Sequence, residues 1–172
     1  MMLLTLAASI PLSAQRVGFK TNALYWLTGT ANAGVELRMS RHYTLNLEAA
    51  VNPLKFGDYK LHLASFTPEV RYWFSARPGA GHFVGIMAGA TAYDIRLKDT
   101  FYYGSAIYAG PTYGYGIVLG RRWNVEGTIG LGLMHVNEKK YGINEQAPVG
   151  ANHKSTKPFP LKAGITFTYI LR

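Results

Sequence analysis

The sequence predicts an all-β protein, an eight-stranded antiparallel up-and-down transmembrane β-barrel, from three observations. After Arg16, apolar and polar residues alternate with period two, which is the pattern of a strand with two different faces. The alternation forms eight segments, most of them about ten residues long, the length of a tilted strand that crosses a bilayer. Glycine (19 residues) and tyrosine (12 residues) are abundant in the 172-residue chain, whereas a helical protein would favour Ala, Leu, Glu and Lys.

The first four segments each combine one apolar and one polar face. Their apolar faces carry Val17, Phe19, Ala23, Tyr25 and Leu27; then Val35, Leu37 and Met39; then Tyr43, Leu45, Leu47, Ala49 and Val51; then Phe66, Val70, Tyr72 and Phe74. Because these side chains recur at every second position, we expect strands at about 17–28, 34–39, 43–52 and 66–74.

The last four segments continue the pattern. Segment 82–94 is rich in small residues, and its favoured apolar face is Val84, Ile86 and Ala88. The apolar faces of the other three carry Tyr113, Tyr115, Ile117 and Leu119; then Trp123, Val125, Ile129, Leu131 and Leu133; then Phe159, Leu161, Ala163, Ile165, Phe167, Tyr169 and Leu171. These faces predict strands at about 112–119, 123–133 and 159–171.

The connections between the segments are predicted to differ in length at the two ends of the barrel. Short turns are expected at 40–42, 75–81 and 120–122, and a further short one at 28–31. Longer loops are expected at 53–60, 94–102 and 137–158. Short turns at one end and longer loops at the other are typical of outer-membrane barrels.

The N-terminus is interpreted as a secretory signal peptide over residues 1–15, followed by a single barrel domain over 16–172. An apolar run ends in the small residues Ser13 and Ala14, as it does before a signal cleavage site. No Lys or Arg precedes that run, so a buried first strand is the alternative, and Pro11 counts against it.

Alternation alone also fits a soluble barrel with an apolar cavity, so the charges and aromatic residues must decide which face points inward. The polar faces hold four cations and four anions, a balance that predicts an interior ion-pair network. These residues are Lys20, Arg38, Arg71, Lys162, Glu36, Glu48, Glu69 and Glu126. Aromatic residues near the short turns predict a girdle at a membrane–water boundary, made of Tyr43, Phe74, Phe83 and Trp123. Both features favour a barrel in a bacterial outer membrane.

The formal net charge of +9 falls on the two ends of the predicted barrel. The short-turn end carries Arg41, Arg77, Arg121, Arg122 and Arg172 with no acid among them. We therefore expect lipid head groups and lipopolysaccharide phosphates as partners, and a possible protein partner at loop 137–158. Nucleic acid is not expected, because the cations are split between two ends and no binding motif accompanies them.

The sequence predicts no catalytic, cofactor or metal site. Cysteine is absent, which excludes disulfides, thiolate metal sites and cysteine nucleophiles. None of the five histidines has a metal-ligand spacing. His62 and Ser65 near Glu69, or His135, leave open a lipid A or phospholipid hydrolase acting at the barrel rim. The interior glutamates are better interpreted as structural counterions than as catalytic acids.

Several motifs resemble an uncharacterised family of small outer-membrane barrels from Bacteroidetes-type bacteria, similar in shape to OmpA-like and OmpX-like barrels. The matching segments are 20–26 (KTNALYW), 34–36 (GVE), 43–49 (YTLNLEA), 52–53 (NP), 68–74 (PEVRYWF), 81–85 (GHFVG), 120–126 (GRRWNVE) and 162–165 (KAGI). The resemblance implies the barrel and its location and supplies no catalytic residues. The function hypothesis is a non-enzymatic barrel that serves as a scaffold or accessory subunit of an envelope assembly. The alternatives are a rim-active lipid-modifying enzyme and a soluble periplasmic carrier.

Overall fold

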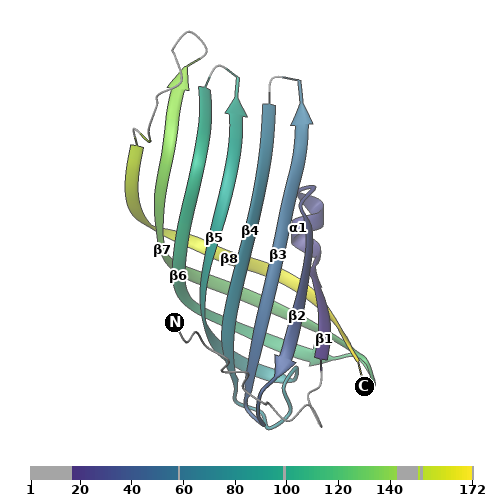
Figure 1. The fold of residues 1–172 in the computed structure, drawn as a ribbon. Coiled ribbons are helices and arrows are strands. Elements are labelled where there is room, and N and C mark those ends of the chain that lie inside the picture. The colour runs from purple at the N-terminus through teal and green to yellow at the C-terminus, as the bar shows by residue number, and fades with distance from the viewer. Residues whose placement is uncertain (1–16, 58, 99, 143–150, 152, 172) are drawn as a thin grey trace, which may run out of the picture.

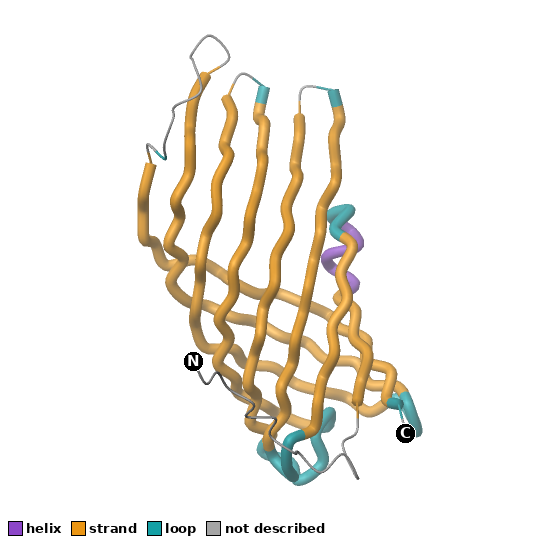
Figure 2. Tube along the Cα trace, viewed as in Figure 1, coloured by secondary structure: helices purple, strands orange, loops and turns teal. Residues whose placement is uncertain are grey.

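A computed structural model describes residues 17–57, 59–98, 100–142, 151 and 153–171. Within this part of the chain, eight strands and one short helix follow one another (Figures 1 and 2). They are β1 (Val17–Asn22), α1 (Ala23–Leu27), β2 (Ala31–Arg38), β3 (Tyr43–Phe56), β4 (Tyr59–Trp73), β5 (Gly81–Leu97), β6 (Thr100–Val118), β7 (Trp123–Gly142) and β8 (His153–Ile170). The predicted signal peptide, residues 1–15, lies outside the described residues.

The strands form one closed antiparallel sheet, in which each strand pairs with its neighbours in sequence. Pairing of β1 with β8, from Gly18 opposite Ile170 to Asn22 opposite Thr166, closes the ring. This up-and-down topology confirms the predicted all-β fold with eight antiparallel strands. Among the described residues, no helix combines the length and apolarity needed to cross a membrane.

The first strand is shorter than predicted, because residues 23–27 form α1 and not the second half of a strand. Asn22 ends β1 in extended conformation, and its side chain accepts a hydrogen bond from the Leu24 amide at 3.1 Å. Asparagine at this position satisfies a free N–H of the first helical turn. Tyr25 and Leu27 fitted a period of two, but five residues are too few to separate that period from a helical one.

The strand lengths are unequal, and this gives the barrel one tall side. β1 and β2 have 6 and 8 residues, whereas β3 to β8 have between 14 and 20. In Figure 1, β3 to β7 therefore rise well above α1 and the ends of β1 and β2. We call these rising parts of the strands the hairpin end, and the opposite end the short-turn end.

The long loops predicted at 53–60, 94–102 and 137–158 are wrong in extent. Pairing continues to Phe56 opposite Tyr59, and to Leu97 opposite Thr100, so only two residues separate the strands at each of the first two connections. In the third, β7 continues to Gly142 and β8 begins at His153, and residues 143–150 and 152 lie outside the described residues. The turns contain Gly57 and Lys98 at φ values of 54° and 52°. Backbone pairing does not depend on side-chain polarity, so the loss of apolar alternation did not mark the ends of these strands.

A β-bulge makes the predicted assignment of faces wrong for the first part of the last strand. Lys162 lies opposite Gly130, but Pro160 lies opposite Leu131, which leaves Leu161 as the extra residue. Beyond the bulge the alternation shifts by one, so Phe159 shares the inner face with Gly132 instead of the outer one. The favoured phase of segment 82–94 is correct, since Val84 and Ile86 point outward and are exposed.

Candidate functional site

Seven charged side chains from six strands join in one network inside the barrel. The cations are Lys20, Arg71 and Lys162, and the anions are Glu36, Glu48, Glu69 and Glu126. All except Glu48 are buried. The strand alternation predicted their shared face, since each comes from an inward-pointing position of its own strand.

Arg71 is the centre of this interior network. Its guanidinium reaches Glu69 at 2.8 Å and Glu126 at 2.9 Å, and Glu36 lies 3.7 Å away. The side chain is completely buried. The planar fork of arginine suits several carboxylates at once, so one residue links β2, β4 and β7.

The two lysines extend the interior network to the strands that close the ring. Lys20 on β1 bonds Glu36 at 2.8 Å and also pairs with Glu126. Lys162 on β8 bonds Glu48 at 2.6 Å and Glu69 at 2.9 Å. Buried charges are tolerated when each has an opposite charge and further hydrogen bonds, as here.

Arg38 was predicted in this network but lies apart from it. Its guanidinium donates to the carbonyl oxygens of Ser40 at 3.1 Å and Ala76 at 3.4 Å. Arg38 is the last residue of β2, so its long side chain reaches the turns at the barrel end. Period-two alternation gives the face of a residue but not its distance from the end of the strand.

Neutral residues complete the interior around the charges. Thr44 donates to Glu36 at 2.6 Å and Thr112 donates to Glu69 at 2.6 Å. Asn46 donates to Glu69 at 3.2 Å. The Thr112 bond satisfies the Glu69 oxygen that the cations leave free, and the other two bonds add neutral donors to oxygens already near a cation, which lowers the cost of burying them.

Phe83 was predicted in the outer aromatic girdle, and the structure contradicts this: its side chain is fully buried. The ring stacks near Trp73, with centroids 4.6 Å apart, and the Arg71 guanidinium lies 4.6 Å from its centroid. Gly114 lies directly opposite Phe83 on β6, where a Cβ would come within 2.5 Å of the ring. An inward glycine opposite an aromatic residue was the sequence signal for this arrangement.

The other three predicted girdle residues do point outward. Tyr43, Phe74 and Trp123 are about half exposed or more, at 48%, 61% and 51%. Tyr43 and Phe74 each pack edge-on against Tyr72, and Trp123 packs edge-on against Tyr169. They therefore form aromatic contacts on the outer wall near the short turns.

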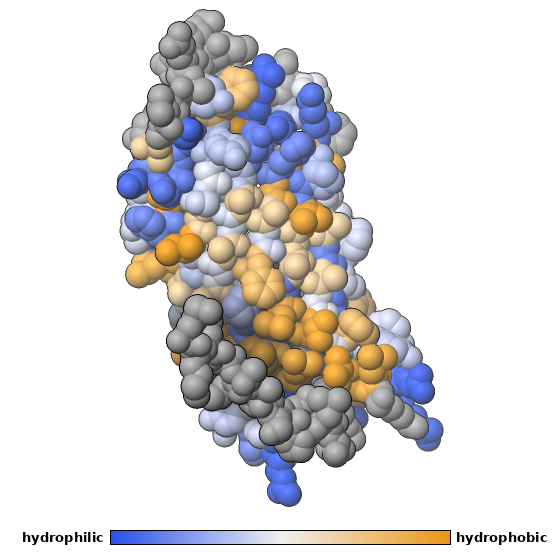
Figure 3. Space-filling model, viewed as in Figure 1, coloured by the Kyte–Doolittle hydropathy of each residue, from blue (hydrophilic) through white to orange (hydrophobic). Residues whose placement is uncertain are grey.

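Apolar side chains cover the outer wall between the short turns and the hairpin end; we call this surface the outer belt. Its most exposed members include Ile86 (72%), Leu131 (64%) and Ile129 (61%). In Figure 3 the orange surface gathers in the lower half of the view, and blue surface predominates above it. The structure thus places apolar groups outside and charged groups inside over this height.

The arrangement reverses at the hairpin end. On its outer face Lys60 forms an ion pair with Asp94, and Arg96 lies over the Phe101 ring at 4.9 Å. On the inner face Leu54 pairs with Leu61, followed by apolar and aromatic residues of β5 and β6, and β7 adds the charged residues Glu138 and Lys140 to this face. Above the outer belt the strands have the sidedness of a protein surrounded by water.

One polar cluster at the hairpin end was missed by the sequence analysis. Glu138 accepts a hydrogen bond from the Tyr93 hydroxyl at 2.6 Å, and lies 3.1 Å from His153. Burial, followed by the bond to Glu138, raises the pKa of Tyr93 above its ordinary value. These residues come from three strands, and only the pairing register brings them together.

The candidate residues for an enzyme do not converge. His62 and Ser65 are three positions apart on β4, which puts them on opposite faces of the sheet. His135 on the outer face bonds Thr156 at 2.8 Å. Among the described residues, no three His, Asp or Glu side chains lie together as a metal site requires.

Fold and site together define a small closed β-barrel with an ion-paired interior and an apolar outer belt. The chain belongs to the family described as "Protein of unknown function (DUF3575)", whose model matches residues 1–171. The predicted membership of an uncharacterised family is thereby confirmed. Searches of curated proteins and of solved structures each gave no match.

Proposed function

We propose that this chain is a bacterial outer-membrane barrel without enzymatic activity, which serves as a structural element or accessory subunit of an envelope assembly. The outer belt carries the proposal. Soluble monomers rarely expose contiguous apolar surface beyond a few hundred Å². A belt around a closed sheet, bounded by polar residues at the hairpin end and arginines at the other, fits the hydrocarbon layer of a bilayer.

The composition of the barrel interior favours the proposed outer-membrane barrel over a soluble carrier protein. A carrier barrel needs an apolar cavity for its ligand. Here the interior at the level of the outer belt is occupied by the interior network and by the rings of Trp73 and Phe83. The apolar surface that a carrier would hide is on the outside.

The hairpin end is the surface proposed to bind a partner. A shallow groove of about 610 Å³ crosses the outer faces of β3 to β7. One row across the strands places the small residues Ala64, Ala92 and Ser105 side by side, next to a row with His62 and Asp94. Lys139 lies in the groove lining and Lys60 lies beside it in an ion pair with Asp94; such cations suit lipopolysaccharide phosphates, and the shape of the groove suits an extended protein segment.

The proposal is tested by fractionating cells that express the full chain, followed by electrophoresis with and without boiling. We expect the protein in the outer membrane, with its N-terminus beginning near residue 16, and faster migration before boiling. A known periplasmic protein in the same cells is the control for fractionation. Recovery in the soluble periplasm with no change on boiling would contradict the proposal and favour the carrier.

A further inference from the structure

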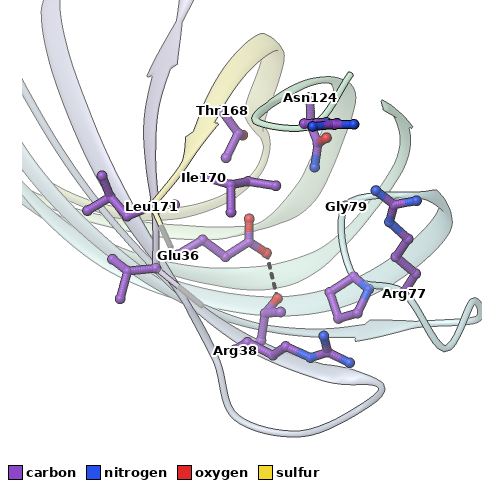
Figure 4. Close-up of a pocket in the computed structure, with 13 residues that line it drawn as sticks. Glu36, Arg38, Arg77, Gly79, Asn124, Thr168, Ile170 and Leu171 are labelled. Carbon is purple, nitrogen blue, oxygen red and sulfur yellow. Dashed lines mark hydrogen bonds between the residues drawn. The ribbon is translucent and has the colours of Figure 1, made fainter. Parts of the chain in front are cut away.

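A cavity of about 380 Å³ opens at the short-turn end of the barrel. Its wall includes three arginines, Arg38, Arg77 and Arg121, from three different parts of the chain. Figure 4 shows Arg38 and Arg77 at the edge of the space, with the Glu36 carboxyl and Thr168 beside it. The volume is within the range of sites for small ligands.

The charge of this cavity is positive. Glu36 is the only carboxylate among its lining residues, and Lys20 at 2.8 Å already neutralises it. Arg77 and Arg121 form no ion pair within the described part of the chain, and both are exposed. Within the described part of the chain, the side chain of Arg38 bonds only carbonyl oxygens, which leave its formal charge uncompensated.

Polar groups without a protein partner line the same cavity. The Thr168 hydroxyl and the side-chain carbonyl oxygen of Asn124 are buried and make no hydrogen bond with any described residue. A buried polar group without a partner costs free energy, so such groups are uncommon unless something binds them. The Thr168 hydroxyl lines the cavity together with the three arginines, so it can donate to a ligand held there.

We infer that this cavity binds a phosphoryl group. Guanidinium forks match the several acceptor oxygens of a phosphoryl group, and the Thr168 hydroxyl supplies a further donor. The phosphoryl group has two possible sources, the head group of a phospholipid at this end of the barrel or a free phosphate in solution. The free-phosphate source does not depend on the proposed function, whereas the head-group source rests on the membrane location proposed above.

The test measures binding to the folded full chain in an uncharged detergent by isothermal titration calorimetry. The two probes are inorganic phosphate and dihexanoyl phosphatidylglycerol. The variant R77Q/R121Q removes two arginines of the cavity, and its affinity should fall at least tenfold. The control variant R41Q/R122Q removes the same charge from the same end, at residues outside the lining, and should stay within about twofold of wild type.

A second variant distinguishes a site with specific hydrogen bonds from non-specific attraction of the phosphoryl group to positive charge. T168V keeps the shape of the side chain and removes an unpaired hydroxyl, so it should fold normally and bind several-fold more weakly. Tighter binding of the lipid probe assigns the site to a head group, and equal or tighter binding of phosphate assigns it to the free anion. No saturable binding of either probe, or equal losses in both double variants, overturns the inference.

Discussion

Replacing Arg71 with methionine should destabilise the barrel more than any other single change in the interior network. Methionine retains the length of the apolar stem and removes the charge. Four carboxylates would then face two lysines, and the carboxylates of Glu69 and Glu126 would each lose one of their cations. Removing one partner from a buried ion pair costs about 3–5 kcal/mol.

The loss of unfolding free energy in R71M should lie at the lower end of that range, because the carboxylates keep other cations. Glu69 retains Lys162 at 2.9 Å, and Glu126 retains Lys20, so neither carboxylate is left alone. The Phe83 ring also loses the cation 4.6 Å from its centroid, worth about 0.5–2 kcal/mol. We expect a total loss of about 3–4 kcal/mol.

Urea unfolding in detergent or lipid vesicles measures this loss of stability. Electrophoresis of unboiled samples identifies the folded protein. With a denaturant slope of about 2 kcal/mol per molar, the midpoint should fall by about 1.5–2 M. R38M is the matched control, because among the described residues Arg38 bonds only two carbonyl oxygens outside the interior network, and its midpoint should hardly change. If R71M does not fold, R71K retains a charge and should show an intermediate loss. Equal midpoints for R71M and R38M would refute the reasoning.

Three further changes test other parts of the structure. G110A should lower stability by about 1–3 kcal/mol, because a Cβ there would overlap the Leu131 carbonyl oxygen of β7 and lie 2.6 Å from the Gly132 Cα. G127A, whose Cβ would meet nothing within 4 Å, should be neutral in the same urea assay. The raised pKa of Tyr93 means that its stabilising contribution is complete below about pH 10 and is lost as the pH rises toward the folded value, so Y93F should flatten the alkaline decrease in stability. I86K on the outer belt should cost about 2–4 kcal/mol in lipid vesicles, whereas A92K at the hairpin end should not; equal effects would argue against a bilayer around the belt.

For residues at the centres of the strands, the inward direction of the side chain was predictable, because each lies between outward-facing neighbours in the alternation. Glu36, Glu69 and Glu126 were assigned to one interior on that basis, and the structure brings them together around Arg71. Which carboxylate meets which cation was not predictable, because it depends on the register between strands. That register is set by turn geometry and by the bulge near Leu161.

The errors occur where a different rule replaces alternation. At Asn22 a helix cap overrides the period of two, and at Leu161 one extra residue reverses it. Phe83 was placed outside because it is an aromatic residue at the start of a strand beside a short turn. A glycine on the neighbouring strand provides the space, so the size of a side chain matters together with the residue opposite it.

Along the strands the outward side chains change from apolar at the outer belt to charged at the hairpin end. This change explains why the hairpins were mistaken for loops. The same strand β4 points Val70 outward at the outer belt and Lys60 outward at the hairpin end, on the same face of one continuous ladder. The proposed bilayer around the outer belt, with water around the hairpin end, would account for this change of side chains, while the backbone pairing continues. In this chain the loss of apolar alternation therefore marks the end of the outer belt and not the end of the strand.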